Sequence, residues 1–435
     1  MKKNLTDSFI EGLIAKSQAI PEAVNRQARK CLLDYIGVTV GGARFLMGCH
    51  PELFDTFTKD IGTCSVLGTD YKTTGANAAL LNGYSAHVLE LDDGHRIGMI
   101  HLGAGIISAI LAVAERDNLG FDRILRGIVM GYESAVRCAC ALQPGHKLRG
   151  YHVSGTCGTI GSAMGVAFAC DYSKEQIEST LACAVTSAAG LLEIQEDASE
   201  LKPYNLGRAA MDGVMASDMG KLAILGPDDI LGGRRGLLAV LTDTPEQSYL
   251  KKFDNDDYCI EGIYQKEYAA CRHCHPAIEA AISICNDNGI NPEQIDVVEV
   301  KTYKLAVKGH DHAEVKGLSS AKLSTPYSVA LAIVRGGAGY EDYEESILTD
   351  ESILSLAKRV LVLEDAQLTL LSPKIRAARV EIVTKEGNVY EKRIDYPKGE
   401  PENPISFEGI KHKTMMLTRE CNNRFVEVLL GKLWD

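Results

Sequence analysis

The spacing of hydrophobic positions predicts helices through the first half of the chain. In residues 6–42 apolar side chains recur at helical spacing, and the pattern closes on Gly41 and Gly42. From about residue 76 to residue 240 helical patterns follow one another, and several are rich in Ala, Gly, Ser and Cys. The clearest examples are residues 155–169 and 181–192. Because such helices can pack closely, the pattern predicts a compact all-α body rather than a sheet covered by helices.

Beyond about residue 262 the pattern changes to strands mixed with helices. Alternating apolar residues predict strands at residues 297–303 and 378–383, and a turn at 386–388 leads into residues 389–394 as a hairpin. Helical patterns accompany the strands, at residues 276–286 and 327–334. We therefore expect a smaller α+β domain here.

A segment with Pro and Gly at residues 397–404 is typical of a linker, and residues 407–430 are again helical. The predicted fold is mainly α. It has a large all-helical domain at residues 1–262, an α+β domain at 263–395, and a C-terminal segment at 396–435 that returns to the helical domain.

Composition and charge narrow the class of protein. The 435 residues carry a formal net charge of -12, which disfavours nucleic acid and acidic membranes as partners but leaves an anionic small substrate open. Residues 1–17 do not resemble a signal peptide, and we expect no membrane-spanning run. The 13 cysteines lie mostly in apolar contexts, so we expect reduced thiols and a cytoplasmic protein.

Titratable residues gather beside apolar sequence at residues 87–101. If residues 87–94 are helical, His87, Glu90 and Gly94 share one face, with Asp93 beside Glu90, and His101 follows after a loop. The alternative is a solvated helix end. Since both flanking segments are apolar or small, we favour acid–base chemistry.

Two further motifs combine polar groups with small-residue helices. His152 precedes a glycine-rich segment in which Thr156 or Thr159 could cap a helix whose N-terminus suits a carboxylate, although a plain capped helix fits equally. Lys202 and Arg208 could clamp a polycarboxylate or stabilise an enolate, and the alternative is a surface loop with solvated charges.

The sequence Cys-Arg-His-Cys-His-Pro at residues 271–276 suggests zinc ligands. No second Cys/His pair follows at zinc-finger spacing, so we expect no metal and prefer His273 or His275 as an acid–base group. Tyr327 could be an acid, although such a tyrosine is more often packed in the core. No dinucleotide-binding glycine motif, P-loop or Gly-x-Ser-x-Gly motif is present.

Taken together, these stretches resemble the MmgE/PrpD family, which includes 2-methylcitrate dehydratases, cis-aconitate decarboxylases and iminodisuccinate epimerases. The resemblance rests on residues 34–38, 82–93, 101–103, 151–161, 202–213, 272–276, 324–330 and 398–404. It implies an α+β lid over a helical domain, a homodimer, and an active site between the domains without metal or organic cofactor.

The resemblance also implies which residues form the site. The family's acidic motif falls on Glu90, Asp93 and Gly94, and its other positions fall on His101, His152, Lys202, His273, His275 and Tyr327. The sequence departs from the usual pattern in five ways. Glu90 replaces an aspartate, Gly94 a threonine or similar polar residue, and Asn205 a common histidine. One extra residue precedes His101, and His-Leu-Gly stands at residues 101–103 in place of His-Pro-Gly.

We assign hypothetical roles on this basis. His101 or His152 is the base, Lys202 with Arg272 binds carboxylates, and His275 with Tyr327 supplies the acid. Glu90 and Asp93 orient the histidines, since their charge would repel an anionic substrate.

The expected function is that of a cofactor-independent lyase of the dehydratase type, acting on a small polycarboxylic acid. A decarboxylase or an epimerase with the same intermediate is the first alternative. A non-catalytic ligand-binding protein is the second.

Overall fold

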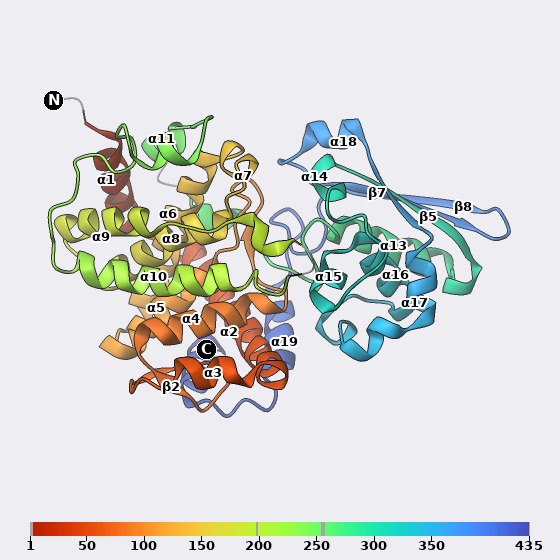
Figure 1. The fold of residues 1–435 in the computed structure, drawn as a ribbon, viewed down its shortest axis with the longest axis horizontal. Coiled ribbons are helices and arrows are strands. Elements are labelled where there is room, and N and C mark those ends of the chain that lie inside the picture. Colours follow the sequence, from red (N-terminus) through yellow and green to blue (C-terminus); the bar gives the residue numbers. More distant parts are fainter. Residues whose placement is uncertain (1–2, 197–198, 254–256, 435) are drawn as a thin grey trace.

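The computed structural model describes residues 3–196, 199–253 and 257–434. It is mainly α-helical with a small mixed sheet, as the sequence predicts. Figure 1 shows two groups of elements side by side, with helices on the left and the sheet with its covering helices on the right. We call these groups the helical body and the sheet lobe. The predicted domain boundaries at residues 262 and 395 stay predictions.

Ten helices of more than ten residues make up most of the described helical body. Two of them, α19 and α20, come from the C-terminal end of the chain. The ten are α1 (Leu5–Ser17), α2 (Glu22–Cys49), α4 (Gly75–Val88), α5 (Gly103–Asp117), α6 (Phe121–Leu142), α8 (Val153–Ala169), α9 (Lys174–Ser187), α10 (Tyr204–Gly220), α19 (Phe407–Thr418) and α20 (Arg424–Trp434). Shorter elements here are α3 (Pro51–Phe57), β1 (Cys64–Ser65), β2 (Lys72–Thr73), β3 (Gly94–His95), α7 (Gly145–Leu148), η1 (Leu192–Gln195), α11 (Leu237–Leu241), α12 (Ser248–Lys251), η2 (Cys259–Gly262) and β4 (Ile263–Tyr264).

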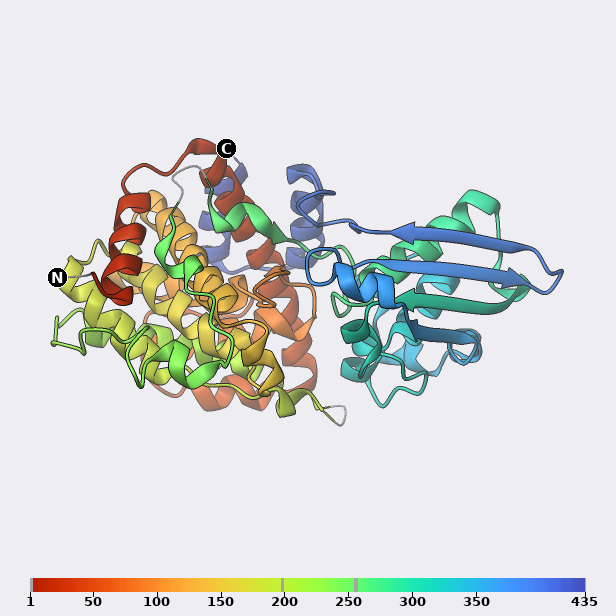
Figure 2. The same ribbon diagram turned by 90° about the horizontal axis from the view of Figure 1, so that it is seen from above.

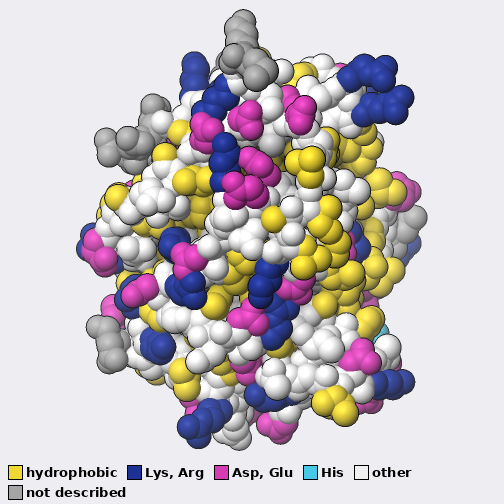
Figure 3. Space-filling view, turned by 90° about the vertical axis from the view of Figure 1, so that its left-hand side faces the viewer, with side chains coloured by type: hydrophobic (Ala, Val, Ile, Leu, Met, Phe, Trp, Pro, Cys, Tyr) yellow, Lys and Arg dark blue, Asp and Glu magenta, His cyan; other side chains and the backbone are white. Residues whose placement is uncertain are grey.

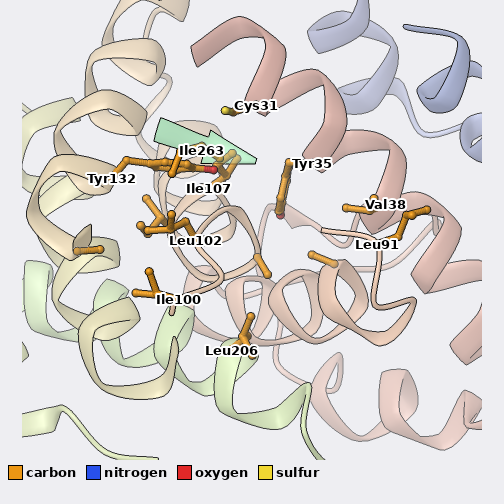
Figure 4. Close-up of a cluster of buried hydrophobic side chains, with 14 of the residues drawn as sticks. Cys31, Tyr35, Val38, Leu91, Ile100, Leu102, Ile107, Tyr132, Leu206 and Ile263 are labelled. Carbon is orange, nitrogen blue, oxygen red and sulfur yellow. The ribbon is translucent and has the colours of Figure 1, made fainter. Parts of the chain in front are cut away.

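Small residues let the helices of the body approach closely. A Cβ atom built on Gly42 of α2 would lie 1.9 Å from the carbonyl oxygen of Ser85 in α4. Likewise, a Cβ on Gly207 of α10 would lie 2.5 Å from the carbonyl oxygen of Leu80 in α4. Every residue of α8 is buried, as its apolar composition predicts. Figure 4 shows part of this core, in which α2, α5, α6, α10, β4 and the loop after α4 all contribute side chains.

The sheet lobe has four strands in the order β6-β5-β7-β8, and β5 pairs parallel with β6 and antiparallel with β7. Its strands are β5 (Ile295–Thr302), β6 (Val360–Glu364), β7 (Ala378–Thr384) and β8 (Val389–Ile394). Its helices are α13 (His275–Asn288), η3 (Pro292–Gln294), α14 (Lys304–Val307), α15 (Leu318–Leu323), α16 (Thr325–Arg335), η4 (Tyr340–Asp342), η5 (Glu345–Thr349), α17 (Glu351–Ala357) and α18 (Ala366–Leu371). Figure 2 shows the strands lying together on one side of the helices. Both the predicted strands and the hairpin are confirmed.

The C-terminal segment contacts helix α2 of the helical body. Lys413 of α19 forms an ion pair of 2.7 Å with the buried carboxylate of Asp34 in α2. Thr414 donates a hydrogen bond of 2.9 Å to the carbonyl oxygen of Leu33. The segment comprises two helices, α19 and α20, rather than one.

Several predicted helix ends are wrong. The first long helical pattern does not close at Gly41 and Gly42, because α2 continues to Cys49 with these glycines at close contacts. Helix α9 ends at Ser187 rather than near residue 192. His152, rather than Thr156 or Thr159, occupies the N-cap position of α8, and both threonines lie inside that helix.

The expectation that no segment is long and apolar enough to span a membrane is also corrected. Helix α2 meets that test by length and composition, with a mean hydropathy of 1.2 over its most apolar window. However, 78% of that window is buried inside the protein. We therefore describe α2 as a core helix.

Candidate active site

The loop between α4 and α5 positions two histidines around one carboxylate. The expected helix over residues 87–94 does not form. Helix α4 ends at Val88, and Glu90 has a φ of 54°, in the left-handed region. The loop places the Asp92 carboxylate 2.9 Å from Nδ1 of His87 and 3.2 Å from Nδ1 of His101. Burial alone would raise the pKa of Asp92, but the two imidazoles outweigh it and hold this pKa well below its usual range. Asp92 was not among the predicted site residues.

The contacts of His101 determine which of its nitrogens meets a ligand. Nδ1 lies between two acceptors, the Asp92 carboxylate and the Asp93 carbonyl oxygen at 3.0 Å, and therefore carries the hydrogen. The lone pair is left on Nε2. Burial lowers the pKa of His101 to about 4, although Asp92 limits the drop, so the ring is neutral near pH 7. His101 is thus arranged as a base.

His152 has the opposite arrangement. The side-chain amide of Asn205 donates to Nδ1 of His152 at 2.9 Å and also lies 3.4 Å from the carbonyl oxygen of Leu191, which fixes the orientation of the amide. The hydrogen of His152 is therefore on Nε2. Burial and the charge of Lys202 hold the pKa of His152 well below its usual range. His152 is a neutral hydrogen-bond donor.

Glu90 is held between two lysines. Its carboxylate forms ion pairs with Lys202 and, at 3.1 Å, with Lys266, which also donates to the Glu90 carbonyl oxygen at 2.7 Å. Burial alone would raise the pKa of Glu90, but the lysine charges outweigh it and lower this pKa well below its usual value. Nε2 of His87 lies 3.4 Å from the same carboxylate. Glu90 therefore positions Lys202 and contacts one histidine.

A cationic cavity of about 100 Å³ adjoins these groups. Four cations line it, namely Lys147, Lys202, Arg272 and Arg376, together with His101, His152, His273 and His310. Among the residues that the structure describes, no aspartate or glutamate lines this cavity. A second cavity of about 280 Å³ shares Lys202 and is lined by His87, Glu90 and Lys322. The charge of the first cavity suits a polyanionic ligand.

Arg272 offers a free guanidinium nitrogen to such a ligand. Its Nη2 pairs with the buried carboxylate of Glu400, and its guanidinium lies 5.3 Å from the ring centre of Tyr264. Its Nη1 is buried and has no hydrogen-bond partner in the described part of the chain. Because a buried N–H group without a partner is costly, a ligand carboxylate at this position would satisfy it.

Three predicted site residues lie away from the cavity. The Asp93 carboxylate accepts from the Tyr132 hydroxyl and, at 2.8 Å, from the backbone N–H of Gly103, and burial raises its pKa to about 7. His275 donates through Nε2 to the Ala270 carbonyl oxygen at 3.1 Å. Tyr327 donates to the Ile347 carbonyl oxygen at 3.3 Å. The acid role assigned to His275 and Tyr327 does not fit this placement.

The structure thus brings together His101, His152, Lys202, Arg272 and His273 and adds residues that sequence reasoning missed. Asp92 stands in the predicted motif, but a helix over residues 87–94 would turn its side chain away from Glu90. Lys147, Lys266, His310 and Arg376 lie far apart in the sequence, and no spacing pattern indicated them.

Comparison with known proteins identifies the family. The model of the MmgE/PrpD N-terminal domain matches residues 8–250, and that of the C-terminal domain matches residues 268–424. The chain belongs to the MmgE/PrpD family, which confirms the resemblance inferred from the sequence.

Similar proteins include fungal and mammalian relatives. A cis-aconitate decarboxylase-like protein, oryM, of Aspergillus oryzae is 24% identical over 94% of this chain and 91% of its own length. The cis-aconitate decarboxylase of Aspergillus terreus is 25% identical over 91% of this chain and 85% of its own length. That of Mus musculus is 22% identical over 99% of this chain and 91% of its own length.

Proposed function

We propose that this chain is a lyase that acts on a small polycarboxylic acid through a carbanion formed next to a carboxylate. The four cations of the cavity support this, since they would hold the carboxylates and stabilise the developing enolate charge. The similarity to lyases over nearly the whole chain agrees with it.

The Asp92–His101 pair is the observation that favours proton abstraction. Nε2 of His101 takes the proton from the carbon next to a carboxylate, and Asp92 stabilises the imidazolium that forms. The electron pair of the broken C–H bond then forms the double bond, while the neighbouring hydroxyl takes the proton from the His101 imidazolium and leaves as water. Nε2–H of His152 donates to the substrate during these steps. Dehydration of the 2-methylcitrate type uses all of these groups.

Decarboxylation of a cis-aconitate-like acid is the second candidate, and the similarity to cis-aconitate decarboxylases favours it. In that reaction the C–C bond breaks, CO₂ leaves, and the electron pair stays on the substrate until a proton is added. It needs no base to begin. Epimerisation would use the same His101 base and return the proton to the opposite face.

Proton NMR in D₂O tests the proposal, with methylcitrate, citrate, cis-aconitate and iminodisuccinate each added to the purified chain. Dehydration gives an alkene that keeps every carbon of the substrate, whereas decarboxylation releases CO₂ and leaves a solvent deuteron on the product. Deuterium exchange into an acid next to a carboxylate reports the carbanion itself. A folded protein that binds these acids without exchange or turnover would contradict the proposal and support the ligand-binding alternative.

The variant His101→Gln tests the assigned base. We expect turnover to fall by about 10²–10⁴-fold, the usual contribution of one positioned base. His412→Gln is the matched control, because His412 is exposed on α19. Full activity of His101→Gln in a folded protein would remove His101 from the mechanism.

A further inference from the structure

Most of the wall of the second cavity, whose volume is about 280 Å³, has no part in the mechanism above. This cavity adjoins the cationic cavity, because Gln195, Lys202 and Leu323 line both of them. A ligand with two carboxylates in the cationic cavity can therefore extend past Lys202 into the larger space.

The wall of the second cavity is largely apolar. Its apolar side chains are Phe45, Leu46, Val88, Leu318 and Leu323. Such a wall suits the methylene groups of a ligand. Glu200 and Glu345 also line the cavity, but they are exposed to solvent. Their charge disfavours a ligand carboxylate at the exposed rim and leaves the inner end of the cavity for it.

Lys322 of α15 supplies a cation inside this cavity. The residue is only 4% exposed, and its ammonium group lies 5.8 Å from the ring centre of Phe45. In the part of the chain that the structure covers, this group has no hydrogen-bond or ion-pair partner. Burial lowers the pKa of Lys322 to about 8, so the cation still predominates at pH 7. Because a buried ammonium group without a partner is costly, a ligand carboxylate would stabilise it.

The buried charges around Lys322 do not balance. The charge of Glu90 acts on Lys322, but the Glu90 carboxylate already forms ion pairs with Lys202 and Lys266. Three ammonium groups thus gather around one carboxylate. This excess of positive charge favours an anionic group of the ligand at Lys322 over an apolar one.

The backbone of α15 is fixed relative to the cationic cavity. The Lys322 carbonyl oxygen accepts a hydrogen bond of 2.8 Å from the backbone N–H of Cys271, next to Arg272. The Leu323 carbonyl oxygen accepts from Nδ1 of His310 at 2.7 Å. Since Cys271 and His310 line the cationic cavity, the fold sets how far Lys322 lies from the carboxylates bound there.

We propose that Lys322 is a specificity-determining residue that binds the terminal carboxylate of a long substrate arm. The substrate class is then a polycarboxylic acid in which one arm has several methylene groups against the apolar wall and ends in a carboxylate. This inference rests on the proposed function, because the other carboxylates of the substrate lie in the cationic cavity.

Titration calorimetry with two acids tests the length of the arm. Tricarballylate has one methylene group in each arm, and hexane-1,2,6-tricarboxylate has three more in one of them. We expect the wild-type chain to bind the longer acid about 10-fold or more tightly, through the buried methylene groups and the contact with the ammonium group. Equal or weaker binding of the longer acid, or no binding of either acid, overturns the inference.

The acid 2-pentylsuccinate isolates the terminal carboxylate, because its arm has the same four methylene groups but ends in a methyl group. The wild-type chain should bind hexane-1,2,6-tricarboxylate about 10-fold or more tightly than 2-pentylsuccinate. Lys322→Met keeps a long side chain without the charge and should abolish this preference. Lys358→Met is the matched control, because Lys358 is exposed on the same lobe, and it should keep the preference. A preference that survives in folded Lys322→Met overturns the role of Lys322.

Deuterium exchange in D₂O separates this inference from the proposed function. A chain that binds the longer acid as expected, but exchanges deuterium into neither that acid nor the four candidate acids, would contradict the proposed function alone. Exchange or turnover of a candidate acid without any preference for the longer arm would contradict this inference alone.

Discussion

At the scale of single residues, Asp92 controls how His101 behaves as a base. Burial lowers the pKa of His101 to about 4, and the Asp92 charge raises it from an even lower value. Since the neutral form is the base, kcat/KM should be level near pH 7 and fall as the pH drops through about 4.

Asp92→Asn removes the charge that raises the pKa of His101. The acidic limb of the pH profile should therefore move to lower pH. Turnover should also fall, by about 10-fold or more, because the imidazolium loses its carboxylate partner. The check is kcat/KM from pH 3.5 to 8 for both proteins, with circular dichroism to confirm folding. An acidic limb that moves to higher pH would contradict the assigned contact.

The sequence predicted those site residues that stand in local motifs. His101, His152 and Lys202 each lie beside small-residue or apolar helices, and this contrast identified them. It could not identify Lys266 or Arg376, because their function depends on contacts with residues far away in the chain. His275 and Tyr327 show the opposite error, since their residue types suggested chemistry that their positions do not support.

At the scale of elements, close packing between α2 and α4 depends on Gly42. A methyl group there would meet the Ser85 carbonyl oxygen, so Gly42→Ala should lower the free energy of unfolding by about 1–3 kcal/mol or more, as overpacking does. Gly48→Ala is the control on the same helix, because nothing lies within 4 Å of its added Cβ.

We expect Gly48→Ala to be neutral or to stabilise the protein by up to about 1 kcal/mol, through helix propensity alone. Urea unfolding of both variants measures the difference. Equal stabilities for Gly42→Ala and Gly48→Ala would show that α2 and α4 do not pack as described.

Strands were easier to predict than helix ends. In β7 alternate residues are buried, so a period of two is visible in the sequence. The local pattern indicates that a helix ends at Gly41 and Gly42, but α2 continues through both residues. Glycine is favoured there because α4 and α19 pack closely against these positions. The end of α4 at Val88 depends on Glu90, whose left-handed conformation is supported by both lysines that bind it.

At the scale of the whole molecule, exposed apolar side chains form a candidate surface for the expected homodimer. They lie on α10 and the residues that follow it, and they are Met215, Met219, Leu222, Ile224 and Leu225. Figure 3 views this end of the helical body, and hydrophobic side chains gather on the right of that view. Large exposed apolar patches often mark protein interfaces, which supports the expected homodimer.

Leu225→Glu tests this interface, because the side chain of Leu225 is 93% exposed and its replacement should not disturb the fold. We expect a dimer for the wild-type chain and a monomer for the variant, measured by light scattering after size-exclusion chromatography. Leu370→Glu, at an 86% exposed position in the sheet lobe, should stay dimeric. A monomeric wild-type chain would contradict the prediction.

The buried carboxylate of Glu400 joins three distant segments. Glu400 belongs to the C-terminal segment. Its carboxylate pairs with Arg96 of the helical body at 2.6 Å and with Arg272, which precedes the first helix of the sheet lobe. The Pro and Gly residues at 397–404 indicate a linker in this segment, but no sequence pattern identifies Glu400 as the residue that pairs with both arginines. Breaking a buried ion pair leaves an uncompensated charge and typically costs about 3–5 kcal/mol.

Glu400→Gln should therefore lower the melting temperature markedly. Glu402→Gln is the control, because Glu402 pairs with the same Arg96 but its side chain is 37% exposed, and its loss should cost less than about 1 kcal/mol. Tricarballylate, an unreactive tricarboxylate, should raise the melting temperature of Glu400→Gln more than that of the wild-type chain, since its carboxylate adds negative charge beside Arg272 where Glu400 no longer supplies it. If calorimetry gave equal melting temperatures for the two variants, Glu400 would not be the residue that joins body and lobe.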